Sequence, residues 1–171
     1  PEAVDYQVKI REKEQHERLV RAERYGLRNA FWTKLLALAK TKSDLHSRNS
    51  PGEYSYISAG SGIRGLGFNY TLRQDYCLVE LYIDRGDSVE NKKAFDALLA
   101  SKAAIETAFG DELDWRRLDD KQASRIIHRI APGGYRADES SWPDIQERMI
   151  DAMIRFEKAL RPTLEKLKTR F

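Results

Sequence analysis

Cysteine, histidine and long apolar runs are all scarce in this sequence of 171 residues. Its single cysteine, Cys77, excludes an intrachain disulfide, and the apolar neighbours of Cys77 predict a buried and unreactive thiol. The three histidines, His16, His46 and His128, lack the paired spacing that zinc sites show. We therefore expect no metal site and no bound cofactor.

No stretch of the chain approaches the roughly 18 consecutive apolar residues that a membrane-spanning helix needs. The opening stretch PEAVDYQVKIREKEQ also lacks the apolar segment of a secretory signal. We therefore expect a cytoplasmic protein without a membrane partner. Because the chain begins at Pro1 and not at methionine, we expect either a piece of a longer protein or a product whose initiator methionine has been removed.

Neither sign of charge dominates the composition. Lysine and arginine total 30 and aspartate and glutamate total 27, which gives a formal net charge of +3. Such a mild basic bias permits contact with nucleic acid but does not indicate it. With 41% hydrophobic residues, a chain of this length predicts one globular domain that buries its own core.

The N-terminal part differs in character from the rest of the chain. Residues 1–26 favour a helix but contain few apolar side chains, which predicts a charged, solvated helical arm or linker. From Leu27 to Lys40, residues such as Phe31 and Trp32 recur at helical spacing and predict a core helix. We expect residues 27–171 to form a single domain.

Strands dominate the middle of the chain. Aromatic and β-branched residues predict three strands joined by short connections, which should pair as an antiparallel meander, at 54–59, 66–73 and 76–84. The third strand alternates, because Cys77, Val79 and Leu81 point to one face while Glu80 and Tyr82 point to the other. One face of the sheet should therefore be aliphatic, and the opposite face aromatic and polar.

Helices and two further strands complete the pattern. Asp87 and Glu90 have the spacing of a capping box at the start of a helix that ends at Gly110. Alternating residues predict two strands near 115–117 and 125–130. A long amphipathic helix follows from Pro143, with a kink or restart expected at Pro162. The order α-βββ-α-ββ-α predicts an α+β fold with an antiparallel sheet of about five strands.

A glycine-rich stretch, Gly60 to Gly65, fits the G-x-G-x-x-G spelling of a dinucleotide-binding loop. That loop requires a helix directly after the glycines, but the stretch Gly67 to Leu72 continues as a strand. The glycines are therefore better explained as a hairpin connection. An anion-binding nest at Ser61 to Arg64 is the alternative.

Catalytic patterns are incomplete. A metal-dependent nuclease of the PD-(D/E)XK type needs an acid-x-Lys on a strand, and Glu80 is not followed by that lysine. Ser124, His128 and Asp119 supply the residue types of a nucleophilic group, but His128 falls on an apolar strand face, which favours a partly buried structural histidine. We expect no catalytic residue in this chain.

Basic residues crowd one region of the sequence. We predict a nucleic-acid-binding surface there, with Arg117, Arg125 and Arg129 on one face and Tyr76 and Tyr82 available for stacking. The full predicted set is Arg116, Arg117, Lys121, Arg125, Arg129 and Arg136. Salt bridges to nearby acidic residues, Glu80 among them, are the alternative use of these cations.

The chain resembles a prokaryotic family, the domain-of-unknown-function family 4268, over roughly residues 27–167. The pieces that carry the resemblance are Phe31-Trp32, Glu80-Leu81-Tyr82, Asn91-Lys92 with Phe95, Ile105-Glu106, and Trp115 with Arg117. Members of that family often lie carboxy-terminal to a PD-(D/E)XK-like nuclease domain. The resemblance therefore implies a nuclease-associated or defence context, and it brings no catalytic motif.

These observations favour a non-catalytic accessory domain that binds nucleic acid through the basic strand region, with a nuclease domain as a further partner. One alternative is a dimerisation module in which Ile150 and Ile154 form a second apolar stripe on the C-terminal helix. Another is an enzyme with a pocket around Glu80. Nucleic-acid binding should weaken steeply with salt, whereas an apolar helix pair should not.

Overall fold

The computed structural model describes residues 2–171 and confirms an α+β domain with one five-stranded antiparallel sheet. The strands lie in the order β1-β2-β3-β5-β4. Their bounds are Tyr56–Gly60 for β1, Leu66–Leu72 for β2, Cys77–Ile83 for β3, Asp114–Arg116 for β4 and Ser124–Ile130 for β5. The helices are α1 (Glu2–Lys40), α2 (Ser88–Leu99), α3 (Lys102–Phe109) and α4 (Trp142–Leu167).

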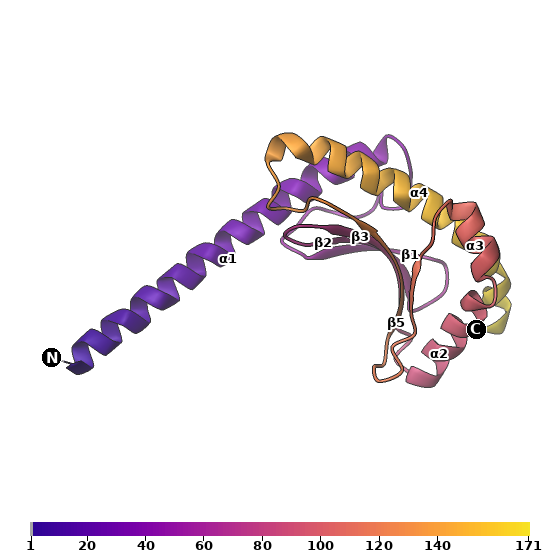
Figure 1. Ribbon diagram of the computed structural model, residues 1–171, viewed down its shortest axis with the longest axis horizontal. Helices are drawn as coiled ribbons and strands as arrows, with labels where there is room; N and C mark the ends of the chain where they lie inside the picture. The colour runs from indigo at the N-terminus through magenta and orange to yellow at the C-terminus, as the bar shows by residue number, and fades with distance from the viewer. Residues whose placement is uncertain (1) are drawn as a thin grey trace.

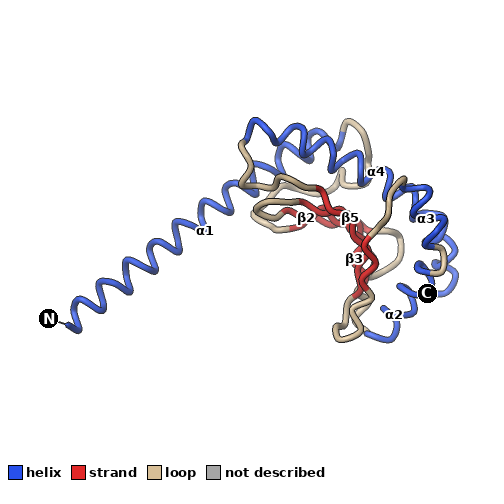
Figure 2. The backbone as a smooth tube through the Cα atoms, viewed as in Figure 1, coloured by secondary structure: helices blue, strands red, loops and turns tan. Residues whose placement is uncertain are grey.

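The sheet is curved, and the helices lie along the outer side of the curve (Figures 1 and 2). The alternation in β3 sets this arrangement, because Val79 and Leu81 are completely buried against the helices, as predicted. Glu80 and Tyr82 point to the opposite face, which no helix within residues 2–171 covers. We call this uncovered side the open face of the sheet.

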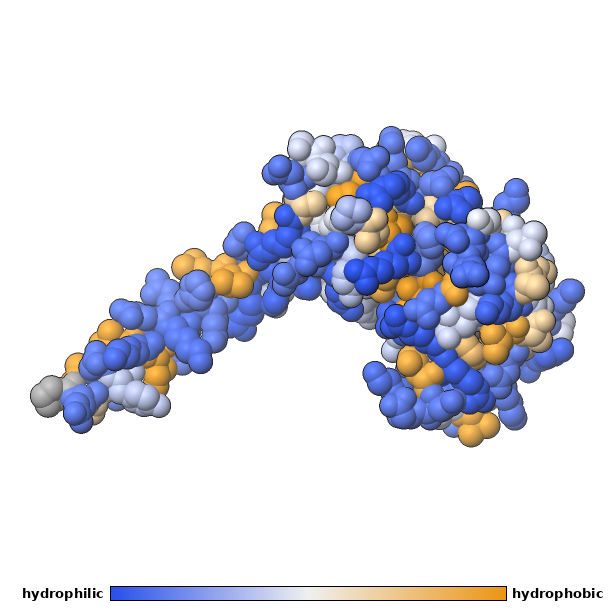
Figure 3. Space-filling view, viewed as in Figure 1, coloured by the Kyte–Doolittle hydropathy of each residue, from blue (hydrophilic) through white to orange (hydrophobic). Residues whose placement is uncertain are grey.

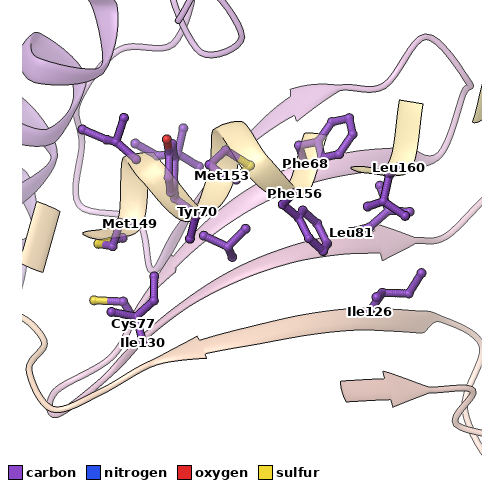
Figure 4. Close-up of a cluster of buried hydrophobic side chains, with 14 of the residues drawn as sticks. Phe68, Tyr70, Cys77, Leu81, Ile126, Ile130, Met149, Met153, Phe156 and Leu160 are labelled. Atoms are coloured by element: carbon purple, nitrogen blue, oxygen red, sulfur yellow. The ribbon is translucent and has the colours of Figure 1, made fainter. Parts of the chain in front are cut away.

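The core lies between the inner side of α4 and the covered face of the sheet (Figure 4). Phe156 of α4 packs edge-on against Phe68 of β2, with ring centroids 6.1 Å apart, and against Phe109 of α3 at 6.0 Å. The end of α1 joins this core through Phe31, whose ring lies 5.2 Å from that of Trp142. Removing these rings from water is the main term that holds the helices to the sheet.

Three helix boundaries differ from the prediction. The arm and the core helix form one continuous helix, α1, which runs through Gly26. The helix predicted over 87–110 divides into α2 and α3, because the N–H of Ser101 bonds to Leu98 at 3.0 Å and tightens the turn between them. Helix α4 continues through Pro162 without a restart. Pro162 and Lys158 are both exposed, so the carbonyl that loses its partner is on the solvent side.

The N-terminal part of α1 projects from the body as an arm, and every residue from 2 to 23 is exposed (Figure 3). Its surface is mostly hydrophilic but carries groups of exposed apolar side chains, among them Val4 with Val8 and Leu19 with Val20. Among the described residues, no helix combines the length and the apolar character that crossing a bilayer requires.

Candidate functional site

Only three of the six predicted basic residues share the open face. The register pairs Arg116 of β4 with Arg125 of β5, and Arg129 lies on the same side of β5 as Arg125 because side chains two or four residues apart face the same way. The guanidinium of Arg129 lies 4.1 Å from the ring centroid of Tyr76. The structure therefore brings these arginines and Tyr76 together at one side of the open face.

The other three predicted residues lie elsewhere. The prediction that Arg117 shares a face with Arg125 and Arg129 is wrong, because β4 ends at Arg116 and the next side chain turns toward α2. Arg117 bonds to Asp96 at 2.9 Å and also to Asp119, and these hydrogen bonds raise its pKa. Lys121 is exposed in the turn before β5.

Arg136 lies apart from both groups, at the base of the arm, where it pairs with Glu23 at 2.7 Å. Salt bridges, the alternative use of the basic residues, are thus found for Arg116, Arg117, Arg125 and Arg136. Among residues 2–171, Arg129 and Lys121 have no carboxylate within salt-bridge distance.

A hollow of about 630 Å³ occupies the open face above β1, β2 and β3. Gly60 and Gly67, which face each other across β1 and β2, add no side chain to one end of its floor. Two exposed aromatic rings border it, those of Tyr56 and Tyr82. From the register these tyrosines lie at opposite corners of the hollow, roughly 16 Å apart. Arg73 also lines the hollow.

A buried polar cluster forms one wall of the hollow. Glu80, with a side chain only 4% exposed, accepts hydrogen bonds from Thr71 at 2.9 Å and from Nε of Arg125 at 2.7 Å. Asn69 lies beside Glu80 on β2, and its Oδ1 atom is buried without a hydrogen-bond partner. Both oxygens of Glu80 are therefore engaged, so its carboxylate positions Arg125 and is not free to act as a base.

The glycine-rich stretch is the hairpin between β1 and β2, as predicted. Gly62 and Gly65 adopt positive φ angles of 94° and 86°, and the N–H of Ser61 closes the turn on the carbonyl of Leu66 at 3.1 Å. No helix follows, because β2 begins at Leu66. The dinucleotide-binding reading is thereby excluded, while an anion-binding nest at this turn stays a prediction.

The glycines of this hairpin should differ in their tolerance of a side chain. Gly65→Ala is expected to lower the free energy of unfolding by about 1–2 kcal/mol, because its φ is left-handed and the new Cβ would lie 2.7 Å from backbone atoms of Asp84 and Arg85. Gly60→Ala should change it by less than about 0.5 kcal/mol, since nothing lies within 4 Å of that Cβ. Urea unfolding of both variants measures the difference, and equal effects would contradict it.

The residues weighed for catalysis do not come together. Ser124 and His128 lie four positions apart on β5, roughly 13 Å, and Ser124 donates its hydroxyl to the carbonyl of Arg117. His128 is half-buried against Phe109, and this burial lowers its pKa.

Burial raises the pKa of Cys77 to about 12, which leaves an unreactive thiol. Within residues 2–171, no three His, Cys, Asp or Glu side chains are grouped as a metal site requires.

The predicted dimerisation stripe is not available on α4. Ile150 is completely buried in the core, and Ile154 is 37% exposed without an apolar neighbour from that stripe. A pocket around Glu80 was one of the alternatives that the sequence left open, and the hollow is lined by Glu80, but sequence reasoning missed that Tyr56 and Gly60 of β1 also line it. The alternation of exposed and buried residues in YISAG, the sequence of β1, is the signal that places Tyr56 and Gly60 on the same face as Glu80 and Tyr82.

One family model, described as "Domain of unknown function (DUF4268)", matches residues 27–164, and the chain therefore belongs to this family. The match confirms the resemblance found in the sequence and begins where α1 enters the core. No curated protein and no solved structure matches the chain.

Proposed function

We propose that this member of the DUF4268 family binds single-stranded nucleic acid along the open face of its sheet. The observation that carries the proposal is that two exposed tyrosine rings share an uncovered, hollowed sheet surface with Arg64 and Arg73, which form no salt bridge among residues 2–171. Such surfaces hold single strands by stacking bases on aromatic rings while cations follow the phosphates. As the family resemblance implies, we place this binding in a nuclease-associated system.

The chemistry of the hollow suits an unstacked base. The ring of Tyr82 on β3 lies beside Gly67 of β2, and the side-chain atoms nearest to that glycine are polar, Oγ of Ser58 and Oδ1 of Asn69. Asn69 and Thr71, both buried in the wall, supply polar atoms at the depth that a base edge would reach. The ends of the hollow carry Arg64 and Arg73, which have no carboxylate partner within the described chain. A duplex, whose bases are already stacked, does not use these features.

Removing both tyrosine rings tests the proposal. Tyr56→Ala/Tyr82→Ala should weaken the binding of labelled single-stranded DNA or RNA at least tenfold, because base stacking on one aromatic ring contributes about 1–3 kcal/mol. The measurement is fluorescence anisotropy at two salt concentrations, with the matched duplex alongside. The control is Tyr6→Ala, because Tyr6 is more exposed than Tyr56 and Tyr82 but lies on the arm.

Two results would overturn the proposal. One is an absence of salt-sensitive binding by the wild-type chain at low ionic strength. The other is an equal loss in the control variant, which would mean that the open face is not involved.

Gly60→Leu provides a second variant, because its side chain would enter the empty space of the hollow while the fold is retained.

A further inference from the structure

A second group of arginines lies where the arm meets the body. Arg24 and Arg28 are four residues apart on α1, so their side chains leave the same face of the helix. The guanidinium of Arg28 lies 5.6 Å from the ring centroid of Tyr135. Tyr135 is in turn fixed to the end of β2, because its N–H donates to the carbonyl of Arg73 at 3.0 Å. We call Arg24, Arg28 and Arg73 the arm-base cluster.

At the base of the arm the carboxylate of Glu23 pairs with Arg136, and the three arginines of the cluster have no carboxylate of their own among residues 2–171. None of its three guanidinium groups lies within salt-bridge distance of an acid among residues 2–171. The hydrogen bond that Arg28 makes is a long one, 3.5 Å, to the main-chain oxygen of Glu53. Burial lowers the pKa of Arg28, with a further contribution from the charges of Arg24 and Arg73. Three cations are thus held near one another without the partners that such a grouping normally has.

Two donors in the cluster are also unsatisfied. The Nε atoms of Arg24 and Arg28 are both buried and have no hydrogen-bond acceptor. A buried donor without an acceptor destabilises a fold, and for a charged group the cost is larger. An anion with several oxygens, held by the terminal nitrogens of these guanidinium groups, would supply negative charge beside the unsatisfied donors and reduce the repulsion among the three charges.

We infer that the arm-base cluster binds a phosphodiester group of the nucleic acid strand that crosses the hollow. The inference rests on the proposed function and adds a second site to it. Continuity supports a phosphodiester, because Arg73 belongs both to the cluster and to the wall of the hollow. A strand leaving the hollow past Tyr56 therefore meets Arg73 first, and Arg28 and Arg24 on the arm next.

The first test measures anion binding without nucleic acid. Inorganic phosphate should raise the melting temperature of the wild-type chain and should have a smaller effect on Arg24→Gln/Arg28→Gln. The matched control is Arg18→Gln/Arg21→Gln, which removes two arginines from the same helix outside the cluster. An equal response to phosphate in both double variants would overturn the inference. Arg73→Gln, at an exposed position, serves as a second cluster variant that leaves α1 unchanged.

The second test measures nucleic acid binding with labelled oligothymidylates of roughly 4 and roughly 16 nucleotides. The cluster variant should bind the longer strand about tenfold more weakly, and the slope of log affinity against log salt should fall by about 0.7, the value for one phosphate contact. The shorter strand, held in the hollow, should bind both double variants alike.

The outcomes separate the two proposals. Wild-type binding of both strands with no difference between the double variants would overturn the arm-base inference and leave the proposed function intact. A lost phosphate response with unchanged affinity for the longer strand would show that the cluster serves another anion, which also overturns a phosphodiester ligand. Failure of the wild-type chain to bind either strand would instead overturn the proposed function on which the inference rests.

Discussion

Replacing Arg125 by leucine is expected to lower the free energy of unfolding by about 3 kcal/mol. The reason is the environment of Glu80, whose side chain is 4% exposed and whose Oε2 atom accepts from Arg125 at 2.7 Å. Without the guanidinium, a carboxylate would remain buried with only the hydroxyl of Thr71 as a donor. This loss in the free energy of unfolding lies at the low end of the range for buried ion pairs, because the side chain of Arg125 is itself 22% exposed.

A double substitution separates two effects on stability, the loss of the ion pair itself and the cost of leaving the Glu80 carboxylate buried without a partner. Glu80→Gln/Arg125→Leu removes both charges and keeps an oxygen for Thr71, so it should be less destabilised than Arg125→Leu alone by at least about 1.5 kcal/mol. Chemical denaturation of the wild type, both single variants and the double variant completes the cycle. Additive effects would contradict the prediction, because they would mean that the two side chains do not depend on one another.

The same pair limits what an arginine scan of the open face can show. Loss of Arg125 would reduce nucleic acid binding by disturbing the wall of the hollow, even with no phosphate contact of its own. Arg129 is the cleaner probe, since its contact is with the ring of Tyr76 and not with an acid. Variants of Arg129 and of the tyrosines therefore test the surface, whereas variants of Arg125 test the fold.

Local patterns were sufficient to predict the sheet and its two faces. In CLVELYI, the sequence of β3, alternation alone separated Val79 and Leu81 from Glu80 and Tyr82, and burial follows that division on the helix side. The hairpin glycines were equally readable, because a strand and not a helix follows them. These features depend on neighbours within a few residues, which is the range over which sequence periodicity acts.

Pairing between distant segments could not be read in the same way. The alternation around Trp115 placed Arg117 on one face with Arg125 and Arg129. The register instead joins Arg116 to Arg125, and a one-residue shift moves a side chain to the other face. The ion pair of Glu80 with Arg125 spans 45 positions, and nearby acids were equally available in the sequence. The arm-base cluster likewise unites α1 with the end of β2, which no local pattern connects.

Acidification from pH 7 to about 4.5 is expected to destabilise the fold by about 2 kcal/mol through His46 alone. His46 is 3% exposed in the loop between α1 and β1, and its ring lies 4.5 Å from that of Tyr70. Burial lowers the pKa of His46 from 6.5 to about 4, although the hydrogen bond with the carbonyl of Phe68 acts in the opposite direction. The neutral ring donates that bond from Nε2 at 3.0 Å.

The sign follows from comparing the two states of the chain. Between pH 6.5 and about 4 the unfolded chain protonates His46 while the folded chain does not, so protons stabilise the unfolded state. Stability therefore falls as the pH falls through this window and levels off once the folded histidine also titrates. Above pH 6.5 the ring is neutral in both states and makes no pH-dependent contribution.

A neutral replacement isolates this contribution from the carboxylates that titrate in the same range. His46→Gln has no charge to gain, so between pH 7 and pH 4.5 it should lose about 2 kcal/mol less stability than the wild type does. His128, whose pKa burial also lowers, is present in both proteins and cancels in the comparison. Parallel stability profiles by urea unfolding would contradict the prediction, because they would mean that His46 has the same pKa in the folded and the unfolded chain.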